Sequence, residues 1–497
     1  MRRPRRAGLT LRAERSRKRL MAKGGLKAVR PARVHANNDA VNSIEAPPPA
    51  RAGHPEEQRR VGSPAGLSER NGTTRARPAD VMALTAIDAD RARAINFDLK
   101  RLDQAFLDDP YPVYRALRDY DPVHRMPDGS YMLTRYADCV EVYRNPALWS
   151  SDKKIEFRGN FADSLLYEHH TTSLVFNDPP AHTRVRRLLT PAFAPRALKA
   201  LEPCIERLVD RLLEEAAQRS HIDLIEDFAA AIPVQLIGDL LGIPLAERGP
   251  LRGWSLAILG ALEPVLGPQQ FARGVAAVDE FKDYLIRLIN RGCAADNAGA
   301  ILQTLVAASE FAGPHSDETE RLSELELLHN CIFLLNAGHE TTTNLIGNSI
   351  DLLLRHPDAM AALRADLRLI GTAVEEFLRM ESSNQLGNRR ALKDTCLGGT
   401  PMAVGTYVHI GIGAANRDPA AFPEPDRLDI RRQPNRHLSF GSGIHTCAGM
   451  SLARMEAQVA ISKLLQRFGS IERAGPVRRG GRARFRGFLN YPVHLAS

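Results

Sequence analysis

Phe440-Gly441-Ser442-Gly443-Ile444-His445-Thr446-Cys447-Ala448-Gly449 is the most informative run of this 497-residue chain. Its glycines lack side chains and tolerate positive φ, so a tight loop can press its backbone against a bulky planar partner. Residues 450–468 follow with apolar side chains at helical spacing, which predicts a helix directly after the loop. Free N–H groups and the helix dipole at that N-terminus favour negative charge. We therefore expect Cys447 to be a thiolate of low pKa that binds a metal.

The other cysteines indicate which metal such a thiolate would bind. They are far apart in the chain and form no C-x-x-C pair: Cys139, Cys204, Cys293, Cys331 and Cys396. This spacing argues against a zinc ribbon, an iron–sulfur cluster or a disulfide scaffold, and it favours a reducing compartment, the cytoplasm. A lone thiolate suits the iron of a heme better than a zinc site, which needs several ligands.

Positive charge is concentrated at the N-terminus. The net charge is +9, but residues 1–81 hold 19 Lys/Arg against 7 Asp/Glu, so the remainder is slightly acidic. The basicity therefore gives no support for binding to nucleic acid. The segment is poor in aromatic residues and rich in Arg, Pro, Gly and Ala, which predicts disorder. We expect residues 1–90 to be a basic extension and residues 91–497 to be the folded domain.

Three interpretations of the extension remain open. It is a real extension, an organelle transit peptide that is rich in Arg and poor in acids, or an artefact of a true start at Met82. The segment contains no apolar region of the kind found in secretory signals, and no run in the chain approaches the length of a membrane span.

A second informative run is Ala337-Gly338-His339-Glu340-Thr341-Thr342-Thr343, inside a predicted helix over 325–354. Three β-branched threonines and a glycine weaken a helix interior. A threonine hydroxyl that bonds to the carbonyl one turn earlier can open the helical ladder and admit water. An acid beside an alcohol at such a place is what proton delivery to bound dioxygen requires.

These runs, taken in order with three others, resemble the bacterial cytochromes P450. The others are Asp178-Pro179-Pro180-Ala181-His182-Thr183-Arg184-Val185-Arg186, Glu376-Phe377-Leu378-Arg379 and Ala415-Asn416-Arg417-Asp418-Pro419. The resemblance covers roughly residues 97–495. It implies a mainly α fold with small β-sheets, in which heme is buried between the long central helix and the helix after the cysteine loop.

The resemblance also implies the roles of individual residues. Cys447 would be the axial thiolate of heme b iron, with Phe440 and Gly449 beside the cofactor. Ala337 and Gly338 would line the oxygen-binding groove against the heme. In that groove Glu340 would be the catalytic acid and Thr341 the catalytic alcohol.

The two carboxylates of a buried heme need cationic partners, because unpaired buried charge is costly. His182 and Arg186 are four residues apart, so a helix places both on one face. His445 is a third candidate partner. The fourth is Arg389 or Arg390; counting back from Asp394 and the following glycine pair favours Arg389, but both remain open.

The Glu376–Arg379 pair is expected to be structural, since it resembles the family's ion pair that supports the heme loop. Its third member would be Arg427 in Phe422-Pro423-Glu424-Pro425-Asp426-Arg427-Leu428. Members of the family usually carry Phe at the position of Leu428.

The resemblance implies a monomeric monooxygenase that inserts one oxygen atom from O2 into a small-molecule substrate. Because the chain ends about fifty residues beyond Cys447, we expect no fused flavin or nicotinamide domain, and electrons from a separate ferredoxin and its reductase. Basic residues near the loop are candidates for docking that partner: Arg431, Arg432, Arg436 and Arg454. Two other classes remain open, namely a heme-thiolate enzyme that works without dioxygen and a heme-thiolate sensor without turnover.

Overall fold

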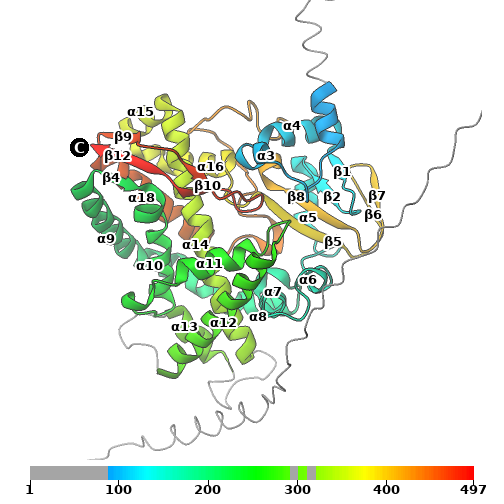
Figure 1. The fold of residues 1–497 in the computed structure, drawn as a ribbon, viewed down its shortest axis with the longest axis horizontal. Helices are drawn as coiled ribbons and strands as arrows, with labels where there is room; N and C mark the ends of the chain where they lie inside the picture. Colours follow the sequence, from blue (N-terminus) through cyan, green and yellow to red (C-terminus); the bar gives the residue numbers. More distant parts are fainter. Residues whose placement is uncertain (1–87, 292–299, 310–320, 497) are drawn as a thin grey trace, which may run out of the picture. The chain divides into compact units, whose positions relative to one another are not determined.

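A computed structural model describes residues 88–291, 300–309 and 321–496 of the chain (Figure 1). Almost all of the predicted extension, residues 1–87, therefore lies outside the described residues. The described part is mainly helical with small sheets, as the sequence predicts.

The principal helices are α3 (Gln104–Asp108), α4 (Tyr111–Tyr120), α5 (Tyr136–Arg144), α6 (Lys154–Phe161), α7 (Leu165–Thr172), α8 (Ala181–Leu189), α9 (Pro195–Arg219), α10 (Ala231–Leu240), α11 (Leu251–Gly260), α12 (Pro268–Arg291), α13 (Ala300–Ala307), α14 (Glu324–Arg355), α15 (Pro357–Ala365), α16 (Ile370–Met380), α17 (Ile412–Ala415) and α18 (Met450–Arg467). The strands are β1 (Val123–Arg125), β2 (Tyr131–Leu133), β3 (Trp149–Ser150), β4 (His221–Asp223), β5 (Leu386–Ala391), β6 (Thr395–Leu397), β7 (Thr400–Met402), β8 (Tyr407–Gly411), β9 (Ser470–Arg473), β10 (Arg478–Arg479), β11 (Phe488–Asn490) and β12 (Pro492–Ala496).

Helix α14 forms the centre of the helical part (Figure 1). It begins with a capping box in which Ser323 and Glu326 satisfy each other's backbone N–H groups. It ends at Arg355, two residues before Pro357, which cannot donate a backbone hydrogen bond to a continuing helix. Helices α7, α10, α11, α12, α16 and α18 pack against it, and most of its side chains are buried. The helix is therefore a rigid element on which a site can be built.

The largest sheet has the strand order β1-β2-β8-β5-β3 and lies to one side of the helices (Figure 1). The β1–β2 hairpin turns at Gly129, whose φ of 84° favours glycine. Strands β5 and β8 are antiparallel and pair Arg389 with Val408. Successive side chains alternate across a sheet, so Arg389 and Arg390 point to opposite faces, and Arg389 is the buried one.

Candidate active site

The cysteine loop between Leu438 and α18 has the glycine conformation that the sequence predicts. Gly441 and Gly443 have φ of 67° and 74°. A Cβ atom on Gly443 would lie 2.3 Å from the carbonyl oxygen of Tyr143, so only glycine fits between the loop and α5. The backbone N–H of Cys447 donates to the carbonyl of Phe440 at 2.9 Å, and Gly449 is the N-cap of α18. The loop therefore holds Cys447 directly before a helix N-terminus.

The predicted low pKa of Cys447 is wrong for the protein without heme. Burial in the protein interior raises the pKa of this thiol above its ordinary value, although part of the side-chain surface remains accessible. The N–H of Gly449 and the charges of Arg186 and Arg454 act in the opposite direction and lower the pKa, but less strongly. The prediction rested on the helix N-terminus, which lowers the pKa of the thiol, and did not include the cost of desolvating the thiolate, which raises it.

Four residues predicted to bind the heme carboxylates gather near this loop from three elements. The rings of His182 and His445 lie 4.1 Å apart between centroids. Arg186, one turn along α8 from His182, donates to the carbonyl of Thr446 at 2.5 Å. Burial and the neighbouring positive charges of Arg389, His182 and Arg186 lower the pKa of His445. The structure thus brings the predicted set together from α8, β5 and the loop.

Arg389 and Arg390 have different surroundings, which separates the two candidates. Arg390 lies 3.3 Å from the carboxylate of Glu156, so its charge is paired. Arg389 is buried, contacts the Tyr143 ring at 5.2 Å, and donates only to the carbonyl of Asn388. The interior position of Arg389 favours it over Arg390.

Lys153 joins this cluster, and sequence reasoning missed it. Its side chain is completely buried, and its Nζ atom has no hydrogen-bond partner among the described residues. Burial first, and then the charge of Arg389, lowers its pKa to about 7. Nothing in its sequence neighbourhood, Ser151-Asp152-Lys153-Lys154, distinguishes it from a surface lysine.

The cluster fits the carboxylates of a heme. Among the described residues, no carboxylate lies within ion-pair distance of His182, Arg186, Arg389, His445 or Lys153. Both ring nitrogens of His182 and Nε2 of His445 are buried without a protein partner. Buried cationic and polar groups without partners are costly, so an anionic group at this place would offset that cost.

The groove on α14 has the predicted threonine hydrogen bond, but the helical ladder is not opened there. The Thr341 hydroxyl donates to the carbonyl of Ala337 at 2.6 Å, one turn earlier, and the helix stays α-helical throughout. Ala337 is exposed, although most of its helix is buried. Gly338 faces another direction, since a Cβ there would lie 2.8 Å from Ile237 of α10. The close packing of α10 against α14 therefore explains why residue 338 is glycine.

Glu340 is almost completely buried and pairs with Arg482, which sequence reasoning also missed. Arg482 donates from one nitrogen to Oε1 of Glu340 and from another to the carbonyl of Leu256 at 3.0 Å. Burial raises the pKa of Glu340 to about 7, although the positive charge of Arg482 lowers it. A carboxyl group with a pKa near neutrality can both hold and release a proton.

The structural ion pair is confirmed, but its predicted third member is wrong. Glu376 and Arg379 are fully buried and joined by two hydrogen bonds of 2.8 Å. The arginine that completes them is Arg432, whose Nε lies 3.2 Å from the Glu376 carboxylate. Arg427 is 61% exposed at its side chain and pairs with Glu424. It contributes to the cluster only through its backbone carbonyl, which accepts from Arg379 and Arg432.

Two of the four arginines predicted to dock the electron donor instead form contacts within the protein. Arg432 pairs with Glu376, and its side chain is only 9% exposed. Arg454 forms two hydrogen bonds with Glu375, at 2.6 and 2.7 Å, and covers the Phe440 ring at 4.7 Å. Arg431 and Arg436 are exposed.

Comparison with known proteins identifies the family. The family described as Cytochrome P450 matches residues 262–474. The chain is 38% identical to the Vitamin D(3) 25-hydroxylase of Pseudonocardia autotrophica, over 72% of this chain and 86% of that protein. It is 37% identical to cytochrome P450 monooxygenase PikC of Streptomyces venezuelae, over 74% and 86% respectively.

Solved structures agree with this assignment. P450BioI in complex with hexadec-9Z-enoic acid ligated acyl carrier protein superposes with a TM-score of 0.72 at 33% identity, covering 79% of this chain and all of that one. CalO2 superposes with a TM-score of 0.73 at 31% identity, covering 81% and 99%. The chain belongs to the cytochrome P450 family and has its fold.

The protein is therefore a P450 monooxygenase, an oxidoreductase that binds heme b through a cysteine thiolate. It acts on a small organic molecule with O2 and receives electrons from separate redox partners. Among the described helices, none combines the length and the apolar character required to cross a bilayer.

Proposed function

We propose that Cys447 supplies the thiolate that binds heme iron, and that His182, Arg186, Arg389 and His445 bind the heme propionates. The observation that carries this proposal is the convergence of two arginines and two imidazoles beside the cysteine of the glycine loop, with no carboxylate among the described residues paired to them. Phe440, Gly449 and Ala337 would surround the ring, with the exposed Ala337 side chain nearest to it. Gly338 would contribute only its backbone, because its α-carbon faces Ile237. Bound heme supplies the activation of dioxygen.

Glu340 and Thr341 would manage protons in this reaction. The Thr341 hydroxyl is held by the Ala337 carbonyl, so its oxygen remains able to accept a hydrogen bond on the groove side. Glu340 holds its proton near neutral pH because it is buried, and Arg482 orients one of its oxygens. The alcohol would position a proton in the groove, and the acid would replace the proton after it is used.

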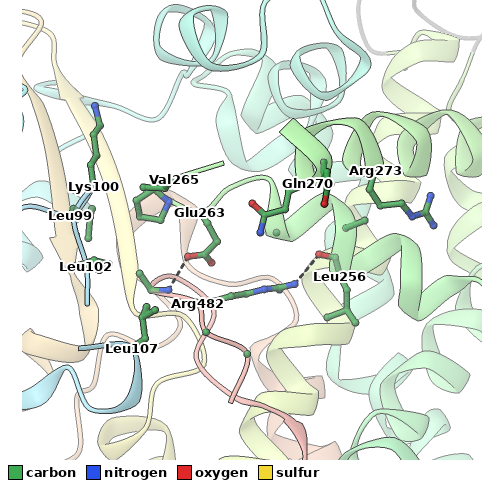
Figure 2. Close-up of a pocket in the computed structure, with 17 residues that line it drawn as sticks. Leu99, Lys100, Leu102, Leu107, Leu256, Glu263, Val265, Gln270, Arg273 and Arg482 are labelled. Atoms are coloured by element: carbon green, nitrogen blue, oxygen red, sulfur yellow. Dashed lines mark hydrogen bonds between the residues drawn. The ribbon is translucent and has the colours of Figure 1, made fainter. Parts of the chain in front are cut away.

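The substrate would enter through a cavity of about 680 Å³ between α11, the start of α12, residues 99–107 and the loop at residues 480–483 (Figure 2). One wall is apolar, with Leu99, Leu102 and Leu107, and the other carries Glu263 and Arg482. This mixture supports an amphipathic organic substrate, because both apolar and hydrogen-bonding surfaces are offered.

We also propose that the electron donor is an acidic ferredoxin-type protein, that the enzyme is a cytoplasmic monomer, and that Arg431 and Arg436 take part in docking. Both arginines are exposed and lie in the segment that leads to the cysteine loop. Separate cysteines without a disulfide framework support a reducing compartment. Charge reversal in Arg436→Glu should raise the KM for the ferredoxin and leave the heme spectrum unchanged.

The reaction itself is tested by NADPH-dependent product formation with a surrogate ferredoxin and reductase. A dioxygen-dependent monooxygenase forms product only with the complete electron chain and O2. Product formed from peroxide alone would favour the enzyme class that works without dioxygen, and spectral binding without any product would favour a sensor.

A further inference from the structure

A second, much smaller cavity lies against α14 and shares Leu256 and Gly480 with the larger one. Side chains of Arg252 (α11), His339, Glu340 and Asn344 (α14) line it, together with the backbone of Gly480 and Gly487 in the C-terminal loop. Gly487 packs so closely that a Cβ there would lie 2.0 Å from Oδ1 of Asn344. The space available to solvent centres is about 10 Å³. That is about the minimum that holds one water molecule.

Five polar atoms, from four side chains on the walls of this cavity, have no hydrogen-bond partner among the described residues. They are Nε of Arg252, Nδ2 of Asn344, both ring nitrogens of His339 and Oε2 of Glu340, and all are buried. Arg252 and Asn344 donate hydrogen bonds, while Oε2 of an ionised Glu340 and one nitrogen of a neutral imidazole accept them. Burial lowers the pKa of His339 to about 3, so the imidazole is neutral. A water molecule accepts two hydrogen bonds and donates two, so it can serve both acceptors and two of the donors of this set.

The remaining hydrogen bonds of these residues hold the walls in place. Arg252 uses another nitrogen to pair with Glu226 at 2.6 Å, and Asn348, one turn after Asn344, donates to the carbonyl of Arg486 at 3.0 Å. Gly480 donates to the carbonyl of Gly487 at 3.1 Å, which closes the loop over the cavity. The cavity is therefore built from fixed elements on three sides.

Glu340 lines the smaller cavity and is joined to the larger one through its ion pair with Arg482. Oε1 accepts a hydrogen bond from the guanidinium of Arg482, a residue that lines the larger cavity in Figure 2. Oε2 belongs to the side chain that lines the smaller cavity. The charged groups that act on Glu340 come from three elements: Arg482 from the C-terminal loop, Arg252 from α11 and Glu263 from the segment after α11. Among the described residues, Oε2 of Glu340 has no hydrogen-bond partner.

We propose that Arg252, His339, Glu340 and Asn344 bind one water molecule, and that His339 is a positioning residue that holds Oε2 of Glu340 through this water. The inference rests on the proposed role of Glu340 in proton delivery. The water donates to Oε2 and to one nitrogen of His339, and it accepts from Arg252 and Asn344. Without the His339 nitrogen, the water loses one of its two acceptors and its fixed orientation.

The direct test is a high-resolution crystal structure of the heme-loaded enzyme. An ordered water within about 3.5 Å of both Oε2 of Glu340 and a nitrogen of His339 is the expected result. A structure in which these atoms have no common water, or in which another protein group fills the cavity, overturns the proposal.

The functional test compares His339→Leu with the wild type across pH. Loss of a hydrogen bond to the ionised form raises the pKa of a carboxyl group. The pH at which the rate of product formation falls by half should therefore rise by about one unit in His339→Leu. His339→Gln retains a donor and an acceptor and should restore the profile. Ser349→Ala, a buried change on the same helix that removes only a hydroxyl bonded to Leu345, serves as the control.

An unchanged pH profile in His339→Leu overturns the proposal, provided that heme content is normal. If His339→Leu does not fold, the wild-type crystal structure and the profile of His339→Gln still decide. Glu340→Gln distinguishes a failure of the proposed role of Glu340 from a failure of the proposed water site. A wild-type rate of product formation in Glu340→Gln would end the proposed role of Glu340 but leave the water visible in the crystal, whereas a slowed rate without a bound water would end the water site alone.

Discussion

The Nε atom of Arg432 lies 3.2 Å from the carboxylate of Glu376, a residue that is fully buried and already paired with Arg379. The Arg432 guanidinium also donates to the carbonyls of Pro423, Glu424 and Arg427. A single side chain thus joins α16 to the loop that precedes the cysteine segment. Removing one partner of a buried ion pair leaves a charge without compensation in the interior.

Arg432→Ala should therefore lower the free energy of unfolding by about 3–5 kcal/mol and reduce heme content. Arg427→Ala is the matched control, because that side chain is mostly exposed and its pairing with Glu424 contributes about 0–1 kcal/mol. Urea unfolding followed by circular dichroism measures both. Equal losses for the two variants would contradict the assignment of Arg432 as the third member.

Cys447→His should abolish the red-shifted Soret band of the ferrous carbon-monoxide complex, since that band requires a thiolate opposite the carbon monoxide. Cys331→Ser offers a control, because Cys331 is also buried but lies on α14, outside the glycine loop. The two spectra are recorded at equal heme concentration. A retained band in Cys447→His would show that another residue binds the iron.

Thr341→Ala should leave the carbon-monoxide spectrum and substrate affinity nearly unchanged but divert electrons into hydrogen peroxide or water. The fraction of electrons found in product should fall at least about tenfold, since positioned proton transfer contributes ~10²–10⁴-fold. NADPH consumption and product are measured side by side. Thr342→Ala is the comparison, because a coupling loss confined to that variant would move the alcohol one residue along.

Glu456→Gln should remove a pH dependence of stability. Glu456 is buried on α18, its Oε2 has no partner among the described residues, and burial raises its pKa from 4.5 to about 8. Between these values the unfolded chain has lost the proton while the folded chain retains it. Stability therefore falls as pH rises through this window, by up to ~1.4 kcal/mol per pH unit.

Unfolding free energies of wild type and Glu456→Gln, measured at several pH values inside that window, test this expectation. The variant should become progressively more stable than the wild type as pH rises. The exposed Glu472→Gln supplies the control for loss of a carboxylate from the same region. A constant difference between wild type and Glu456→Gln would mean that Glu456 is ionised in the folded protein.

A truncated chain that begins at Met82 should bind heme and unfold like the full chain. The reason is compositional, since residues 1–81 are strongly basic and lack apolar periodicity, and the folded domain is proposed to comprise residues 91–497. Heme content per chain and the urea midpoint are compared in the two forms. A clear loss of either on truncation would show that the segment packs on the domain or assists its folding.

Sequence reasoning succeeded wherever the determining interactions are local. The glycine loop was predictable because positive φ at Gly441 and Gly443 is a property of the backbone at those residues. The Thr341 hydrogen bond follows from helical geometry, which places the Ala337 carbonyl four residues earlier within reach. Pairing of Glu376 with Arg379 follows from the same geometry.

Reasoning from the sequence failed wherever burial or a distant partner decides the outcome. The sign of the Cys447 pKa shift depends on desolvation, which no local pattern reports. The sequence around Lys153 does not distinguish it from a surface lysine, and only its burial beside Arg389 reveals its place in the cluster. Arg427 matched the expected motif position, but the chain path places Arg432 against Glu376 instead.

The sequence by itself determined the family, the cysteine loop, the threonine helix and the candidate cationic residues, because each is encoded in a short run whose spacing fixes its local geometry. Only the tertiary structure decided that Arg389 and not Arg390 faces the cluster, that Arg432 completes the buried ion pair, and that Arg482 pairs with Glu340 across 142 residues of chain. The physical reason is that side-chain partners across such separations are selected by how the helices and sheets pack, and packing depends on the whole core and not on any one segment.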